Sequence, residues 1–203
     1  MSGLFISLVL SYLIGSMPTS YIAARFLKKI DIRRHGSGNA GATNVFRVVG
    51  KIPGIIVLVI DMLKGSFAVY FLPAVFFNNS IGLKMGLELY EILLGIAVIS
   101  GHVWSIFLKF KGGKGIATTA GALLVIAPKL LLGCAVTWGI VFGIFRIVSV
   151  ASIAASLALP LFAVIFYGSF YLVLTAVVLC AASVYKHKSN IRRLLRGEEK
   201  KLV

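Results

Sequence analysis

Runs of apolar residues alternate along this chain with short polar segments that carry most of its lysines and arginines. A helix needs roughly 20 apolar residues to cross a bilayer, so each run predicts one membrane-spanning helix. The predicted spans are residues 3–25, 53–77, 86–108, 116–130, 131–146, 149–167 and 168–186. The chain is therefore expected to be an all-α, polytopic membrane protein, with seven spans in a single domain over residues 1–203.

The distribution of positive charge predicts how these spans are oriented. With the N-terminus outside, the cytoplasmic segments are residues 25–52, 109–115, 146–148 and the tail from 187 onward. Counted with Lys186 at the last boundary, they hold 18 of the 21 lysines and arginines. Because positive loops stay in the cytoplasm, the C-terminus is expected there too. The tail, residues 187–203, places apolar residues at helical spacing between arginines, which predicts a short amphipathic helix on the inner membrane surface.

Composition narrows the classes of function. Apolar residues make up 59% of the chain, charged residues 13%, and the mean hydropathy is +1.00, so a soluble domain and a nucleic-acid binder are both excluded. The net charge of +15 favours anionic partners, namely membrane lipid head groups or phosphorylated substrates. Cys134 and Cys180 lie in apolar runs without metal-ligand spacing, and carboxylates are scarce, so no metal or other cofactor is expected.

The first cytoplasmic loop concentrates small polar residues. Residues 35–44 include three glycines, two asparagines and two hydroxyls, which predicts a hydrogen-bonding loop rather than a helix. Arg47 follows and offers a guanidinium fork suited to phosphate oxygens. An ordinary turn is the alternative, but a turn rarely needs so many short donors. The candidate binding residues in this loop are Ser37, Gly38, Asn39, Thr43, Asn44 and Arg47.

The second loop carries Gly-Gly-Lys-Gly at residues 112–115, directly before a predicted helix. Glycine N–H groups and a helix N-terminus favour an anion, and Lys114 supplies the positive charge. The segment is not a nucleotide-binding P-loop, because Gly115 stands where a serine or threonine would follow the lysine. The candidate residues here are Gly112, Gly113, Lys114 and Gly115. His102, at the inner end of the preceding span, is a further candidate for substrate binding or for packing.

Other polar residues lie at or within the bilayer. Asp61 and Lys64 are three positions apart on a helix, so they are expected either to pair or to contact a substrate. Ser149 and Ser152 are one turn apart beside the short inner turn at Arg146. His187 and Asn190 share a helix face at the end of the last span. These serines, His187 and Asn190 are candidate substrate-binding residues.

Six segments together resemble a known family. They are Ser37-Gly-Asn-Ala-Gly-Ala-Thr-Asn44, Asp61-Met-Leu-Lys-Gly65, Gly101-His102, Gly112-Gly-Lys-Gly-Ile-Ala-Thr118, Arg146-Ile-Val-Ser149-Val-Ala-Ser152 and His187-Lys-Ser-Asn-Ile-Arg-Arg-Leu-Leu195. Their order and spacing, from the first span to the tail, are similar to those of the bacterial acyl-phosphate:glycerol-3-phosphate acyltransferases. The resemblance implies a multi-pass protein of the bacterial inner membrane whose active site faces the cytoplasm.

The resemblance also implies the reaction. The 1-hydroxyl of glycerol 3-phosphate attacks a fatty acyl phosphate, giving lysophosphatidic acid and phosphate, the first acylation of phospholipid synthesis. Ser37, Asn39, Thr43 and Lys114 are the expected catalytic residues. No histidine in the sequence is followed five positions later by an aspartate, the spacing of soluble glycerolipid acyltransferases. Acyl phosphate carries its own leaving group, so positioning and electrostatic stabilisation can suffice, with the donor's phosphate accepting the proton.

Two other classes fit parts of the pattern. A small-anion or phosphate-ester transporter also uses glycine-rich breaks between spans, but here the polar clusters gather on one side and no related halves are evident. A CDP-alcohol phosphotransferase needs closely spaced aspartates for its metal, whereas this chain has only Asp31 and Asp61.

Overall fold

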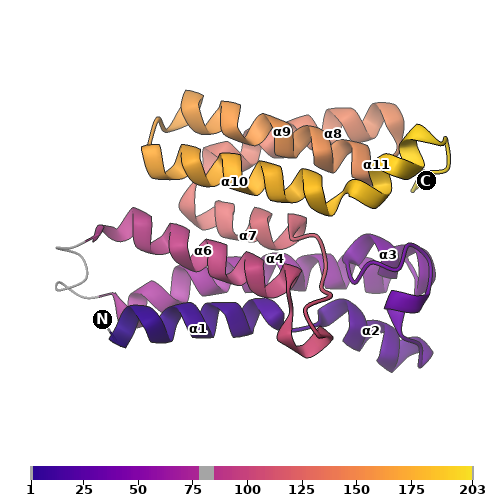
Figure 1. Cartoon of the computed structure of the whole chain (residues 1–203), viewed down its shortest axis with the longest axis horizontal. Helices are drawn as coiled ribbons and strands as arrows, with labels where there is room; N and C mark the ends of the chain where they lie inside the picture. The colour runs from indigo at the N-terminus through magenta and orange to yellow at the C-terminus, as the bar shows by residue number, and fades with distance from the viewer. Residues whose placement is uncertain (1, 78–84, 203) are drawn as a thin grey trace. The chain divides into compact units, whose positions relative to one another are not determined.

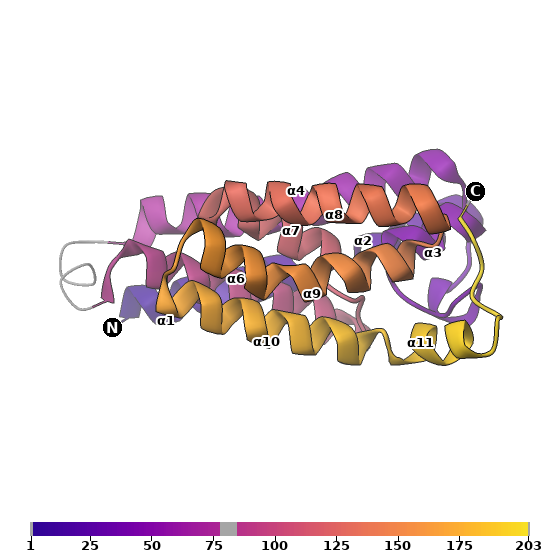
Figure 2. The ribbon, with the colours of Figure 1, turned by 90° about the horizontal axis from the view of Figure 1, so that it is seen from above.

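The structure is a computed structural model that describes residues 2–77 and 85–202. Within these ranges every regular element is an α-helix or a short 3-10 helix (Figures 1 and 2). The chain forms two compact units, Met1–Ile126 and Ala127–Val203, which we call the N-terminal and C-terminal units. The expected all-helical fold is confirmed.

The N-terminal unit is built on three long helices and a short one. Helix α1 packs along α6, and α4 packs along α7, with further contacts from α4 to α1 and α6. Two short elements, η1 and α3, lie in the first polar loop, and η2 lies in the second. The elements are α1 (Ser2–Ser16), α2 (Thr19–Lys28), η1 (Ile32–Arg34), α3 (Ala42–Val48), α4 (Lys51–Phe76), α6 (Leu87–Val103), η2 (Ile106–Leu108) and α7 (Ile116–Ile126).

The C-terminal unit is a bundle in which α9 packs against both α8 and α10 (Figure 2). Helix α10 ends at a bend of 55°, after which the amphipathic α11 begins. The tail was expected to form such a helix, and it does so over eight residues. The elements are α8 (Pro128–Phe145), α9 (Val148–Phe166), α10 (Phe170–Lys186) and α11 (Lys188–Leu195).

Within the described residues, five helical stretches are long and apolar enough to cross a bilayer, and a sixth is obtained if α10 and α11 count as one bent span. The stretch expected at 116–130 is an 11-residue helix, α7. The expected boundary between 130 and 131 is wrong, because the break falls at Ala127. Pro128 occupies the first turn of α8, where its missing N–H has no helical partner to lose, so it starts the next helix there.

Glycines allow the helices of the N-terminal unit to approach closely. A Cβ atom on Gly121 of α7 would lie 1.9 Å from the Met62 carbonyl oxygen of α4, and one on Gly65 of α4 would lie 2.3 Å from that of Thr118. The pair α1 and α6 repeats this arrangement, since a Cβ on Gly15 would lie 2.0 Å from the Val98 oxygen. Such close backbone contact is how membrane helices gain packing energy without a hydrophobic driving force.

We expect Gly121→Ala to separate α4 from α7 and lower the free energy of unfolding by about 1–3 kcal/mol, the usual cost of overpacking. Thermal unfolding of the detergent-purified protein measures the change. The control is Gly139→Ala in α8, where an added Cβ meets nothing within 4 Å. Equal melting temperatures for the two variants would contradict the role assigned to Gly121.

Candidate functional site

Asn44 organises the first polar loop. The residue is 1% exposed, and its Nδ2 lies 3.0 Å from the carbonyl oxygens of His35 and Asn39 and 3.2 Å from that of Ile32. Its Oδ1 accepts a hydrogen bond from the Ser37 N–H at 2.9 Å. Both halves of this amide therefore bind the loop's own backbone, which folds residues 32–44 around one buried side chain.

The predicted residues of this loop lie around Asn44, partly on a helix that was not expected. Ser37 and Gly38 are exposed, whereas Asn39, Thr43 and Arg47 are half-buried. Thr43 and Asn44 are in the first turn of α3 and Arg47 is in its last, so the loop expectation is wrong from Ala42 onward. Gly38 adopts φ +72°, a left-handed conformation that favours glycine, so this position shapes the loop.

Asp31 fixes the entrance to the same loop. Its carboxylate accepts the backbone N–H of Arg33 at 3.0 Å, which caps η1, and the Arg33 guanidinium at 2.8 Å. The hydrogen bond from the Arg33 side chain lowers the pKa of the Asp31 carboxyl to about 2. The same guanidinium donates to the Leu108 carbonyl at 3.4 Å. The first polar loop is thereby tied to the second.

The second polar loop is held against the end of α6. The Gly112 N–H donates to the Val103 carbonyl at 3.2 Å and the Gly113 N–H to the His102 carbonyl at 3.0 Å. These two glycines were expected to offer their N–H groups to an anion, and instead those groups bind the chain itself. Glycine is required here for close approach, because a Cβ on Gly112 would lie 2.0 Å from the His102 oxygen.

Lys114 and Gly115 stand where this loop turns into α7. Lys114 is half-buried, and Gly115 adopts φ +86°, which lets the chain turn into the helix. Because the first N–H groups of a helix have no partner within the helix, the start of α7 remains suited to an anion.

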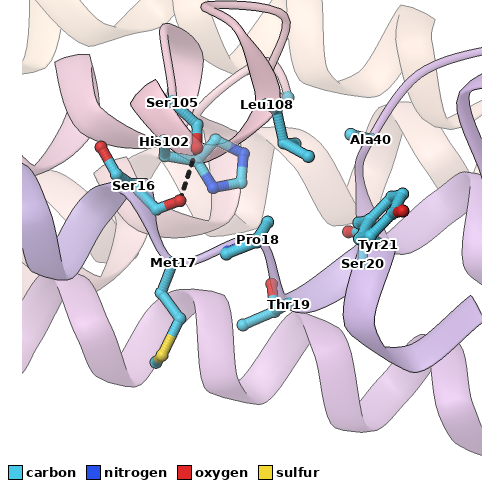
Figure 3. Close-up of a pocket in the computed structure, with 11 residues that line it drawn as sticks. Ser16, Met17, Pro18, Thr19, Ser20, Tyr21, Ala40, His102, Ser105 and Leu108 are labelled. Atoms are coloured by element: carbon cyan, nitrogen blue, oxygen red, sulfur yellow. Dashed lines mark hydrogen bonds between the residues drawn. The ribbon is translucent and has the colours of Figure 1, made fainter. Parts of the chain in front are cut away.

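A small pocket lies where the two loops meet (Figure 3). Ala40 of the first loop, His102 at the end of α6 and Gly113 of the second loop line it, together with residues at the break between α1 and α2. A Cβ on Gly113 would lie 2.2 Å from His102 Nε2 and 2.8 Å from the Ala40 oxygen, so the three residues converge. The loops that the sequence singled out separately are therefore neighbours in the N-terminal unit.

Two buried hydroxyls in this pocket were missed from the sequence. Ser16 and Ser20 lie on either side of the break between α1 and α2, and their Oγ atoms have no hydrogen-bond partner in the described chain. Figure 3 shows both side chains beside the pocket, with the Ser105 hydroxyl donating to the Ser16 carbonyl at 2.6 Å. Buried hydroxyls normally have a partner, so these two suit a small polar molecule. Serines in an apolar run carry no sequence signal for this role.

A buried ion pair supports the pocket. Lys64 Nζ lies 2.8 Å from Asp61 Oδ1, with side chains 3% and 1% exposed. Asp61 also accepts the Thr19 hydroxyl at 2.6 Å, and Lys64 also donates to the Met17 carbonyl at 3.3 Å. Of the two expectations for this pair, the ion pair forms. It joins α4 to the break between α1 and α2.

His102 completes this cluster. Its Nδ1 is 2.8 Å from Lys64 Nζ and 3.6 Å from Asp61 Oδ1. A lysine ammonium only donates, so Nδ1 accepts and the ring proton resides on Nε2. The structure thus brings a histidine near an aspartate that the sequence order did not reveal. Lys64 is the nearer of the two partners of this nitrogen, with the Asp61 carboxylate within ion-pair distance.

In the C-terminal unit, four predicted residues are buried at the start of α9, at the end of α10 and in α11. Ser152 accepts the Trp138 indole N–H at 3.2 Å. His187 Nδ1 donates to the Ser183 carbonyl at 2.8 Å, which leaves Nε2 as the nitrogen turned toward other groups. Ser149 and Asn190 both donate to one oxygen of Glu199, at 2.8 and 2.6 Å. Glu199 was not singled out from the sequence.

Comparisons with known proteins give these features a common setting. The fold and the pocket define a class, that of helical membrane proteins with two polar loops converging on a pocket. The family model for glycerol-3-phosphate acyltransferases matches residues 5–197. A relative named glycerol-3-phosphate acyltransferase 2, from Moorella thermoacetica, is 45% identical over 97% of this chain and 96% of its own length. The chain belongs to the glycerol-3-phosphate acyltransferase family.

Further relatives agree with this assignment. A glycerol-3-phosphate acyltransferase from Desulforudis audaxviator is 45% identical over 98% of this chain and 96% of its own length. A solved structure also matches: the crystal structure of PlsY, an integral membrane glycerol 3-phosphate acyltransferase, in its glycerol 3-phosphate form. Its sequence is 35% identical to this chain and the TM-score is 0.87. The match covers 99% of this chain and 96% of the PlsY chain. The lysophosphatidic acid form of PlsY has a TM-score of 0.83, with 99% and 95% covered.

We expect Asp61→Asn to destabilise the protein by about 3–5 kcal/mol, because it leaves the Lys64 ammonium buried in the membrane without its counter-charge. Unfolding in detergent measures the loss. Asp31→Asn makes the same chemical change at a partly exposed pair and is expected to cost no more than about 1 kcal/mol. If the two substitutions cost the same, the buried pair is not the anchor described here.

Proposed function

We propose that this chain transfers a fatty acyl group from an acyl phosphate to the 1-hydroxyl of glycerol 3-phosphate, giving lysophosphatidic acid and inorganic phosphate. The observation that carries the proposal is the match over nearly the whole chain to PlsY, whose two structures are a glycerol 3-phosphate form and a lysophosphatidic acid form. An acceptor and its acylated product define an acyl transfer. A transporter, the rival class, finds no support among the relatives.

The step balances without a cofactor. The glycerol hydroxyl oxygen forms a bond to the acyl carbonyl carbon, and the bond from that carbon to the phosphate oxygen breaks. The hydroxyl proton passes to the departing phosphate. The protein then needs to hold two anionic molecules and stabilise the negative charge that develops between them. This fits two loops that are built from small polar residues and cations.

We assign roles from the geometry of each unit. Lys114 and the N–H groups at the start of α7 hold the acyl phosphate, while Gly112 and Gly113 shape the loop rather than donate to it. Ser37, Asn39 and Thr43 line the reacting centre, with Gly38 and Asn44 holding their loop in shape. In the N-terminal unit, Arg47 is assigned to a substrate phosphate. In the C-terminal unit, Ser152, His187 and Asn190 are assigned to glycerol 3-phosphate. His102 acts through Gly113, which it contacts by its backbone carbonyl.

An assay with purified protein tests the proposal. Labelled glycerol 3-phosphate and acyl phosphate should yield lysophosphatidic acid, and acyl-CoA in place of acyl phosphate should yield none. Uptake of glycerol 3-phosphate into protein-containing liposomes without product would instead establish the transporter. Product formed from acyl-CoA at the same rate would show that the donor is wrong.

Lys114→Ala is expected to lower kcat/KM by about 100- to 1,000-fold, because the loss of one electrostatic donor to the transition state costs ~3 to 4 kcal/mol. The matched control is Lys111→Ala, an exposed lysine of the same loop, which should keep activity within about twofold. Near-normal turnover by folded, membrane-inserted Lys114→Ala protein would remove Lys114 from the mechanism.

We further propose seven crossings in the bacterial cytoplasmic membrane, with the N-terminus outside, the polar loops and tail in the cytoplasm, and α7 as the short crossing. The supporting observation is the asymmetric distribution of lysines and arginines. At 11 residues α7 is shorter than the bilayer core, so the loop preceding it must enter the membrane surface.

Labelling with a membrane-impermeant maleimide tests this orientation in intact cells, with Cys134 and Cys180 replaced by alanine. Lys129→Cys, at an exposed position of α8, is expected to react from outside. Arg34→Cys, exposed in the first polar loop, is expected to react only after permeabilisation. The reverse pattern would invert the topology.

A further inference from the structure

Glu199 lies at the centre of a hydrogen-bond cluster near the C-terminus. Its Oε1 accepts the Ser149 hydroxyl at 2.8 Å and the Asn190 amide at 2.6 Å, and its Oε2 accepts the Arg193 Nε at 2.6 Å. Its side chain is only 3% exposed. A buried carboxylate is costly unless it is paired and fully hydrogen-bonded, so three donors on one carboxylate mark a built arrangement.

The backbone delivers Glu199 to this position. After α11 the chain reverses at Gly197, whose φ of +70° favours glycine. The Gly197 N–H donates to the Leu194 carbonyl at 3.0 Å and the Glu198 N–H to the Arg193 carbonyl at 2.8 Å, which closes the turn. The Leu202 N–H then donates to the Arg146 carbonyl at 2.9 Å. The tail is thus fastened to the turn between α8 and α9.

The charge on Glu199 is retained in this setting. Burial alone would raise the pKa of its carboxyl, but the hydrogen bonds from Arg193, Asn190 and Ser149 outweigh burial and hold the pKa below its ordinary value. An ionised carboxylate accepts hydrogen bonds and donates none. The Ser149 hydroxyl proton is therefore committed to Glu199, and Ser149 presents lone pairs to any other group. Such an acceptor can bind a glycerol hydroxyl, which donates a hydrogen bond, but not an ionised phosphate oxygen, which only accepts.

We propose that Glu199 is a positioning residue for glycerol 3-phosphate: it holds Ser149 at the start of α9 and Asn190 in α11 in the orientations in which they receive this substrate. This inference rests on the proposed function, in which Asn190 anchors glycerol 3-phosphate. One carboxylate oxygen accepts hydrogen bonds from both side chains. Its loss therefore leaves both the Ser149 hydroxyl and the Asn190 amide free to rotate. The carboxylate touches no substrate itself, and its effect is confined to the binding of the acceptor.

Steady-state kinetics of the full-length protein test the proposal, after wild-type protein has been shown to form lysophosphatidic acid. Glu199→Gln keeps the shape of the side chain but replaces one accepting oxygen by a donor. We expect its KM for glycerol 3-phosphate to rise about tenfold, equivalent to about 1.4 kcal/mol, with kcat and the KM for acyl phosphate within about twofold. Glu198→Gln, the same change at the exposed neighbouring position, should leave all three unchanged.

The outcomes separate this proposal from its alternatives. Active wild-type protein with an unchanged KM in Glu199→Gln overturns it, as does a fall in kcat alone, whereas wild-type protein that forms no product overturns the proposed function instead. A KM that falls would show that Glu199 competes with substrate for these donors, which also overturns it. Where Glu199→Gln is not recovered folded, Glu199→Asp carries the test: it keeps the charge but shortens the reach, and its KM for glycerol 3-phosphate should rise by a smaller factor.

Discussion

A charged side chain inside a membrane helix needs a counter-charge within the protein. The Asp61–Lys64 pair meets this need, and the packing of the N-terminal unit depends on how it does so. The pair could have been satisfied within α4 alone. Instead Asp61 also binds Thr19, and Lys64 also binds Met17 and His102, at distances of 2.6 to 3.3 Å. Because lipid offers no alternative partner, these bonds fix the end of α6 and the break between α1 and α2 relative to α4. His102 in turn holds the glycine-rich loop, because its backbone carbonyl accepts the Gly113 N–H.

Close backbone contact is the second means of holding these helices, and it complements the first. The glycine contacts of α4 with α7, and of α1 with α6, give attraction that is spread along the helices and specifies no single register. The ion pair is local and specifies one. Together they explain how a unit with so many lipid-facing apolar side chains can still place Ala40, His102 and Gly113 around one pocket.

The sequence predicted the helical membrane fold, its family and both polar loops, because apolar length and clustered glycines are local signals. It failed where partners are distant or are backbone atoms. The sequence did not show that the Asn44 amide binds carbonyls 5 to 12 residues away. Gly112 and Gly113 were read as anion donors, yet their N–H groups bind the end of α6. Glu199 was passed over because an acidic residue in a charged tail has the sequence appearance of a solvated one.

Three of the six carboxylates, those of Asp31, Asp61 and Glu199, each bind a cation of the chain. In a protein of net charge +15 they hardly change the field that draws anions to the surface. Their effect is local, since each one immobilises a loop or a helix end next to residues assigned to substrate. Two sets of charges therefore have different roles: the cations attract anions, and the three carboxylates orient the side chains around them. In the proposed function, the numerous cations would concentrate phosphorylated molecules at the membrane. A few carboxylates, each bound by several donors, would set the geometry in which those molecules are received.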